Sequence, residues 1–174
     1  MANTKKTVKP KIVKCRYGHC LHETKELNAE DAVKIGNAYY HKDCNQTKEE
    51  IKKIADIFVE RVNRNVVFPV LMKTINNIVF DKGIGSEFLL FALNSYLNKN
   101  KPLNYPGGLY YIIQNAEIQR EYKLLQEKKM HEEQLRIQKE AAAEAFTIDS
   151  SNSNGNTFTY KPTKQKGFDA IFGK

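Results

Sequence analysis

The sequence contains no tryptophan, only three cysteines among 174 residues, and no long apolar run. No stretch approaches the roughly 18 uninterrupted apolar residues of a membrane-spanning helix. The N-terminal residues also lack the apolar segment of a signal peptide. Three cysteines are too few for a disulfide framework, so the cysteine usage predicts a cytoplasmic protein. With 41% hydrophobic and 28% charged residues, the composition is typical of one globular domain with appendages.

The common motifs of catalytic sites are also missing. The sequence has no glycine-rich phosphate-binding loop, no nucleophile elbow and no metalloprotease helix motif. The one histidine outside residues 15–44 is His131, which falls in a polar segment expected to be a solvated helix. Catalysis needs an open metal position or a cluster of acid and base groups in a cleft. We therefore expect a protein that is not an enzyme.

The net charge of +8 resides at the two ends of the chain. Residues 1–14 contain five lysines and no acidic residue, and residues 161–174 have a net charge of +3. The residues between these ends contain 19 basic and 19 acidic side chains. A basic N-terminal arm can serve solubility alone, or it can contact nucleic acid non-specifically and in a salt-dependent way. The candidate nucleic-acid contacts are Lys5, Lys6, Lys9, Lys11 and Lys14.

The densest chemical signal is a cluster of cysteine and histidine, because six of the seven such residues in the chain fall between positions 15 and 44. They include two short-spaced pairs, Cys15 with Cys20 (C-x4-C) and His41 with Cys44 (H-x2-C). Two pairs of this kind let two local turns each offer two ligands to one tetrahedral Zn²⁺. We expect these four residues to hold one structural zinc ion.

The segment between the two pairs predicts a β-hairpin over residues 32–40 with a Gly-Asn turn. A knuckle, a hairpin and a ligand-bearing helix together form a treble clef. VKIGNAYYHKDC (residues 33–44) resembles the second half of the first zinc module of LIM domains, and the resemblance covers residues 15–45. It implies a protein-binding platform. The chain departs from the family in its wider first pair and in having no second zinc module, so His19 and His22 remain alternative ligands to a cysteine.

Apolar residues recur at helical spacing after the cysteine and histidine cluster. Ile51, Ile54, Ala55, Phe58, Val59 and Val62 would form the buried side of the first helix, and Phe88, Leu89, Ala92, Leu93 and Tyr96 that of the third. We expect helices over residues 44–62, over 69–80, over 86–97 with Ser86 as N-cap, and from Pro106 to about Leu125. The helix would continue over residues 126–146 as a polar arm with opposite charges four residues apart.

The stretch FLLFALNSYLNKNKPLNYPGGLYYIIQN, within residues 88–115, is similar to the C-terminal helical domain of DnaD-like replication initiation proteins of Gram-positive bacteria and their phages. The matching positions are Ala92, Tyr96, Tyr111, Ile112 and Ile113. The resemblance implies a scaffold that contacts DNA and recruits helicase-loading proteins; the alternative is an ordinary helical core. Tyrosines of this region could stack on bases of single strands, or they could belong to the core; the candidates are Tyr105, Tyr110, Tyr111 and Tyr122.

The C-terminal peptide places Gln165, Phe168, Ile171 and Phe172 at relative positions 1, 4, 7 and 8. This pattern is similar to sliding-clamp-binding peptides, although an aromatic residue usually stands at the place of Ile171. A flexible segment before the peptide would allow it to search for a protein pocket. The alternative is that its apolar residues fold back onto the helical body.

The sequence thus predicts a mainly α protein: a small treble-clef zinc module followed by a helical bundle with a long projecting helix and a flexible tail. The function we expect is that of a non-enzymatic zinc-binding adaptor in a DNA-processing complex, in particular replication, of a phage or low-GC bacterium. The alternative is a phage-type inhibitor that blocks a host enzyme. The expected parts are a disordered basic arm (1–12), a zinc module (13–48), a helical body (49–125), a polar helix (126–146), a linker (147–160) and an interaction peptide (161–174).

Overall fold

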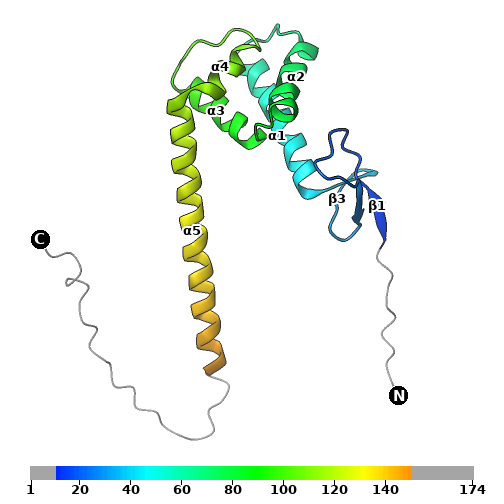
Figure 1. Cartoon of the computed structure of the whole chain (residues 1–174), viewed down its shortest axis with the longest axis vertical. Coiled ribbons are helices and arrows are strands. Elements are labelled where there is room, and N and C mark those ends of the chain that lie inside the picture. The colour runs from blue at the N-terminus through cyan, green and yellow to red at the C-terminus, as the bar shows by residue number, and fades with distance from the viewer. Residues whose placement is uncertain (1–10, 150–174) are drawn as a thin grey trace, which may run out of the picture. The chain divides into compact units, whose positions relative to one another are not determined.

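The computed structural model describes residues 11–149, with side chains described as far as residue 141 (Figure 1). The chain divides into two compact units, Met1–Glu127 and Lys128–Lys174. The elements are β1 (Ile12–Lys14), β2 (Glu26–Asn28), β3 (Val33–Ile35), β4 (Ala38–Tyr40), α1 (Lys42–Arg61), α2 (Phe68–Asn76), the π-helical turn η1 (Asn77–Asp81), α3 (Ser86–Asn98), α4 (Gly108–Gln114) and α5 (Ala116–Asp149). Within residues 11–149 no helix combines the length and the apolar character that crossing a membrane requires.

Two small antiparallel hairpins form the N-terminal module, residues 11–44. The β3–β4 hairpin confirms the predicted one, and its turn contains Gly36 at φ +58°, a conformation that costs glycine little because it has no Cβ. The β1–β2 hairpin pairs Val13 with Leu27 and was not predicted. Its strands are three residues long, too short for a period-two pattern to stand out in the sequence.

Helix α1 begins two residues earlier than predicted. His41 takes the N-cap position directly after β4, and the carbonyl of His41 accepts the first helical hydrogen bond from Asn45 N–H at 2.9 Å. The hairpin therefore runs into the helix with no intervening loop. This continuity places His41 and Cys44 one helical turn apart at the start of a rigid element.

The second predicted helix is divided. Helix α2 has Pro69 in its first turn, as the sequence indicated, but the chain widens into η1 from Asn77 to Asp81. Gly83, at φ +65°, then ends the segment before α3. A π-helical turn is rare, and nothing in the hydrophobic pattern distinguishes it from α-helix.

The expected N-cap of α3 was wrong. Gly85 takes the cap position, and Ser86 is the first helical residue, buried at 6% exposure. Its hydroxyl donates a hydrogen bond to the Glu50 carboxylate of α1 instead of capping its own helix. The polar side chain thus links two helices of the core.

The single helix expected from Pro106 to beyond Leu125 is two helices. Helix α4 ends at Gln114, and α5 begins at Ala116. The side-chain oxygen of Asn115 accepts hydrogen bonds from the backbone N–H groups of Glu117 (3.0 Å) and Ile118 (3.3 Å), so Asn115 is the N-cap of α5. The apolar spacing continues across this break, which is why the pattern concealed it.

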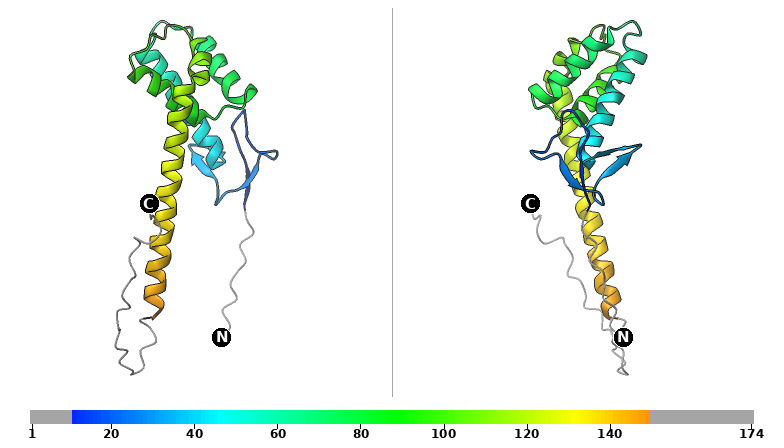
Figure 2. Two further views of the ribbon diagram at one scale, coloured as in Figure 1. Left: turned by 60° about the vertical axis from the view of Figure 1, so that its left-hand side comes forward. Right: turned by 90° about the vertical axis from the view of Figure 1, so that its right-hand side faces the viewer.

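One continuous core holds α1 to α4 and the start of α5 together as the helical body, residues 45–127 (Figures 1 and 2). The mainly helical class is therefore confirmed. Val59, Val62, Phe88 and Tyr96, expected to be buried, are only partly so. The buried residues of this core are Ile51, Ile54, Ala55, Phe58, Leu71, Ile75, Ile78, Val79, Leu89, Ala92, Leu93, Leu109, Ile112, Ile113 and Ile118.

The second unit, taken by itself, continues α5 from Lys128 to Asp149. Residues 128–141 are all exposed, and Arg136 pairs with Glu133 (2.7 Å) and Glu140 (3.6 Å). The helix runs to Asp149, three residues into the segment expected to be a linker. The rest of that linker, the C-terminal peptide with Gln165, Phe168, Ile171 and Phe172, and the arm residues Lys5, Lys6 and Lys9 lie outside the described residues.

Candidate metal centre

The four predicted ligands come together at the junction of the hairpins and α1. One donor atom each from Cys15, Cys20, His41 and Cys44 lies within 4.8 Å of the other three. The Cys20 and Cys44 sulfurs are 3.8 Å apart. His41 Nδ1 lies 3.6 Å from the first of these sulfurs and 3.7 Å from the second. The sequence prediction that these residues form one cluster is therefore confirmed.

These separations fit a tetrahedral ion. With metal–sulfur bonds of about 2.3 Å and metal–nitrogen bonds of about 2.0–2.1 Å, tetrahedral geometry places two sulfurs about 3.8 Å apart and a sulfur and a nitrogen about 3.6 Å apart. The observed distances of 3.8, 3.6 and 3.7 Å agree with both values. The four donors can thus hold one metal ion.

Backbone pairing sets the position of the first ligand pair. Cys15 follows β1, and its N–H donates to the Lys25 carbonyl at 2.6 Å. The next N–H, of Arg16, donates to the Tyr39 carbonyl of β4 at 2.9 Å. The first bond extends the pairing of β1 with β2, and the second joins the first hairpin to the second. They bring the chain after β1 beside the N-terminus of α1, where the second ligand pair is found.

Backbone N–H groups also donate to the sulfurs, as is expected where thiolates bind a metal. Leu21 N–H donates to the Cys44 sulfur at 3.4 Å. Burial would raise the pKa of Cys15, but hydrogen bonds from the backbone of Tyr17 and His41 and from the thiols of Cys20 and Cys44 together outweigh burial, so this pKa is lowered. Burial raises the pKa of Cys44 to about 12. Metal binding must therefore displace a proton from Cys44, and it should weaken as the pH falls.

The two alternative histidine ligands lie outside the four-residue cluster. The His19 ring stacks on Phe80 at a centroid distance of 4.3 Å and an interplanar angle of 10°. His22 Nε2 lies 2.8 Å and 3.0 Å from the two carboxylate oxygens of Asp43. The His22 ring is the main reason why the pKa of Asp43 is below its ordinary value.

A second group of donors, formed by His22, Asp43 and Cys44, also lies within 4.8 Å. It shares Cys44 with the first group, so the two groups cannot each hold a metal ion with a Cys44 ligand of its own. Its 2.8 Å nitrogen–oxygen contact is that of a hydrogen bond. Nitrogen and oxygen ligands on one tetrahedral ion would be about 3.3 Å apart, given bonds of about 2.0–2.1 Å. The geometry thus favours the group with three cysteines.

The N-terminal module has a very small core of its own. Its buried residues are Cys15, Tyr40 and Cys44, so two of the three are candidate ligands. Domains below about 40 residues usually need a disulfide, a metal or a partner to fold. The three cysteines are free thiols in this structure. A metal ion at the cluster would supply the folding free energy that so small a core lacks.

Aromatic side chains that the sequence analysis overlooked join the module to the helical body. Besides the stacking of His19 on Phe80, the Tyr17 ring lies 6.3 Å from the Phe80 ring and 6.2 Å from the His19 ring. Tyr17 and His19 belong to the loop between Cys15 and Cys20, whereas Phe80 is part of η1. No local pattern could reveal a contact between positions so distant in the chain.

The other candidate residues are dispersed. Lys11 lies directly before β1 and Lys14 is its last residue, next to Cys15, and both lysines are exposed. Tyr122 packs between Phe88 and Phe91, and the Lys82 ammonium lies 4.6 Å above the Tyr110 ring. The two strongly exposed candidates for base stacking are Tyr105 (56%) and Tyr111 (70%). Of the positions similar to DnaD-like proteins, Ala92, Ile112 and Ile113 are core residues.

Comparisons with protein-family models, curated proteins and solved structures found no match to this chain.

Proposed function

We propose that this protein is a non-enzymatic adaptor whose N-terminal module is a treble-clef-like fold held by one structural Zn²⁺. The observation that supports the zinc site is the set of donor separations at Cys20, His41 and Cys44, which equal those of a tetrahedral zinc complex. Three thiolates and one imidazole are ligands that zinc prefers, whereas magnesium and calcium prefer oxygen. Zinc bound here would supply folding free energy to the module.

A structural role follows from the number of protein ligands. A tetrahedral zinc ion that is bound by four side chains has no position left for water or substrate. Catalytic zinc sites instead keep one position open. The proposed zinc therefore acts on the fold of the module and not as a Lewis acid.

The adaptor role is proposed for a DNA-processing complex, in particular replication in a phage or low-GC bacterium. Its support is the resemblance of residues 15–45 to LIM zinc modules and of residues 88–115 to DnaD-like proteins, together with the exposed rings of Tyr105 and Tyr111. The 19 basic and 19 acidic residues between the tails favour protein contacts over a DNA-reading face. The N-terminal lysines and the C-terminal peptide would add non-specific DNA contact and a tethered protein contact.

The zinc proposal predicts one zinc per chain. The full chain, purified without added metal, should contain about one equivalent of zinc by elemental analysis, as a closed four-ligand site implies. Chelation should broaden or shift the amide resonances of residues 11–44 and leave those of the helical body, since that core is independent of the metal. Intact resonances of the module after complete zinc removal would contradict the structural role.

The adaptor proposal predicts a protein partner that survives nuclease treatment. We would capture partners from host lysate with the full chain and with a chain ending at Phe146. A partner lost on truncation would assign the contact to the C-terminal segment, and a partner kept by both would assign it to residues 1–146. Capture that disappears entirely after nuclease treatment would overturn the adaptor reading. Tight one-to-one capture of a single host enzyme, with inhibition of its activity, would instead support the inhibitor alternative.

A further inference from the structure

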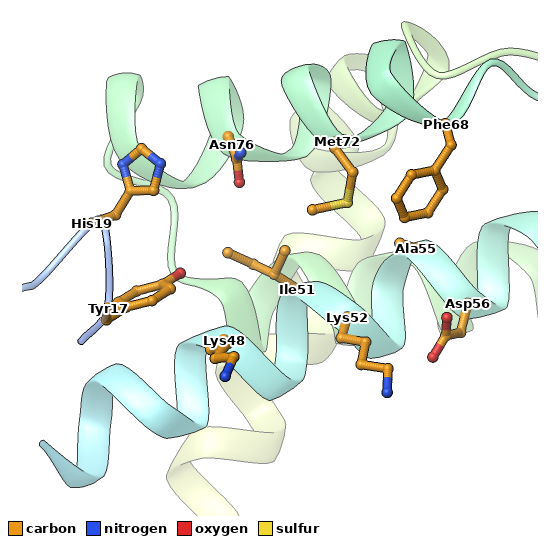
Figure 3. Close-up of a pocket in the computed structure, with 10 residues that line it drawn as sticks. All are labelled: Tyr17, His19, Lys48, Ile51, Lys52, Ala55, Asp56, Phe68, Met72 and Asn76. Atoms are coloured by element: carbon orange, nitrogen blue, oxygen red, sulfur yellow. The ribbon is translucent and has the colours of Figure 1, made fainter. Parts of the chain in front are cut away.

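An apolar groove of about 320 Å³ lies between α1 and α2. Ile51 and Ala55 of α1 form its buried floor, and Phe68 and Met72 project from α2 toward them (Figure 3). Phe68 is 52% exposed although it lines this groove. The α2 wall has nine residues, from Phe68 to Asn76, which span about 12 Å of helix or roughly two turns.

The α1 edge of the groove carries an ordered row of charges. Lys48, Lys52 and Asp56 are spaced four residues apart and line the same groove (Figure 3). The Lys48 ammonium is held 4.4 Å above the Tyr40 ring and 3.3 Å from its hydroxyl. Lys52 and Asp56 are exposed, and among residues 11–141 neither has an ion-pair partner. Along this edge the charges are therefore positive, positive and negative, and each charged residue lies about 6 Å from the next along the helix axis.

We infer that this groove is the docking site for an amphipathic helix of a partner protein, with two acidic residues and one basic residue along its edge. Charge complementarity supports this choice: carboxylates four residues apart on the partner would face Lys48 and Lys52, and a cation would face Asp56. An apolar helix face in a groove between two helices is a common mode of peptide recognition. The inference rests on the proposed adaptor function and names the chemistry of one partner.

The metal-binding loop closes one end of this groove. Tyr17 and His19 line it, and both lie between the candidate ligands Cys15 and Cys20. The stacking of His19 on Phe80 holds the loop against the end of η1. Metal that fixes Cys15 and Cys20 would therefore also fix the end wall, and the groove would be complete only in the metal-bound protein.

The test uses synthetic helical peptides as probes. Each has leucines on one face and a neighbouring stripe of three charged residues four apart. Two probes have the stripes Glu-Glu-Lys and Lys-Glu-Glu, for the two directions in which a helix can lie. Their counterparts with every charge reversed, Lys-Lys-Glu and Glu-Lys-Lys, are the matched controls. Binding to the full chain is measured by fluorescence anisotropy at low salt.

We expect one of the first two probes to bind at least about tenfold more tightly than its charge-reversed counterpart, because three attractive contacts become repulsive. The variant K48E/K52E/D56K should reverse this preference. All three side chains are exposed, so the variant should remain folded. Equal binding of a probe and its counterpart, or a preference that the variant does not reverse, would overturn the proposal.

A second pair of variants tests the groove wall. Phe68→Ala should weaken the preferred probe about tenfold, since an aromatic anchor in a docking groove contributes strongly to binding. Val70→Ala is the control, because Val70 is on the same helix and is also 52% exposed but does not line the groove. Equal effects of the two variants would overturn the placement of the probe.

Two further comparisons separate this inference from its alternatives. Chelation should lower the affinity for the preferred probe at least about tenfold. Unchanged affinity in a protein shown to have lost zinc would overturn the role of the end wall. If the protein never contains zinc and still binds the probe with the expected charge preference, the groove would be supported and the zinc site refuted. Binding that appears only in a chain ending at Phe146 would assign the groove to the chain's own C-terminal segment, and binding that competes with self-association would assign it to a second copy; either result overturns the proposal.

Discussion

Replacing Cys44 with serine should abolish stoichiometric zinc binding and unfold the N-terminal module, while the helical body stays folded. Cys44 is fully buried, and its sulfur is within 3.8 Å of the Cys20 sulfur and 3.7 Å of His41 Nδ1. A serine hydroxyl is a poor replacement for a thiolate at a soft zinc site. Because binding and folding are coupled in small zinc modules, loss of the ligand should be seen as loss of structure.

The expected loss is large. Apparent binding free energies of structural zinc are about 10–16 kcal/mol at pH 7, and the module has little else to replace them. Its own core consists of Tyr40 and the candidate ligands Cys15 and Cys44. Elemental analysis should fall from about one zinc per chain to almost none, and amide exchange of residues 11–44 should accelerate. Circular dichroism of the helices should change little.

His22→Gln is the matched control for this experiment. His22 is exposed and lies beside the cluster, where it contacts Asp43 and its ring lies at a centroid distance of 3.9 Å from the His41 ring. As a neighbour and not a ligand, it should be replaceable with zinc stoichiometry unchanged and affinity reduced by no more than about 10–100-fold. If His22→Gln lost the zinc and Cys44→Ser retained it, the ligand set would be wrong.

The cluster of candidate metal ligands could be predicted from the sequence because the spacing that marks it is local. The spacing of His41 and Cys44 fixes them one turn apart at a helix start, and the hairpin before them is marked by the Gly36 turn. Most of the helical body was also predictable, since the period of apolar residues follows from the geometry of an α-helix. These features need no knowledge of what the chain packs against.

The features that escaped prediction depend on contacts between distant segments. The break at Asn115 lies within an unbroken apolar pattern, and only the hydrogen bonds from Glu117 and Ile118 reveal it. Serine is a common N-cap residue, but the Ser86 hydroxyl instead donates a hydrogen bond to the Glu50 carboxylate of another helix. The choice between His19 and the cysteines as ligands was also non-local, because it depends on Phe80, some sixty residues away.

Helix α1 contributes to the cores of both the N-terminal module and the helical body, and this makes the coupling between these two parts testable. Its first turn contains the candidate ligand Cys44, and its fifth turn contains Phe58 of the body core. The two positions are 14 residues apart, about 21 Å along the helix. Effects of substitutions at such a distance usually add. A change in the body core should therefore leave the zinc stoichiometry of the folded protein unaltered.

Phe58→Ala tests the body core in this way and should lower the free energy of unfolding by about 3–5 kcal/mol, the usual cost of removing a fully buried phenylalanine. Phe58 has no exposed surface and is among the largest buried side chains. The measurement is urea unfolding of the zinc-loaded protein followed by circular dichroism, with the slope m unchanged. Leu124→Ala is the control: Leu124 is 65% exposed on α5, so its loss should change stability by less than about 0.5 kcal/mol. A loss of less than about 1 kcal/mol of unfolding free energy for Phe58→Ala, or equal losses for the two variants, would mean that α1 does not anchor the body core. The expected loss, with one zinc still bound per chain, would show that the N-terminal module and the helical body are stabilised separately although they share one helix.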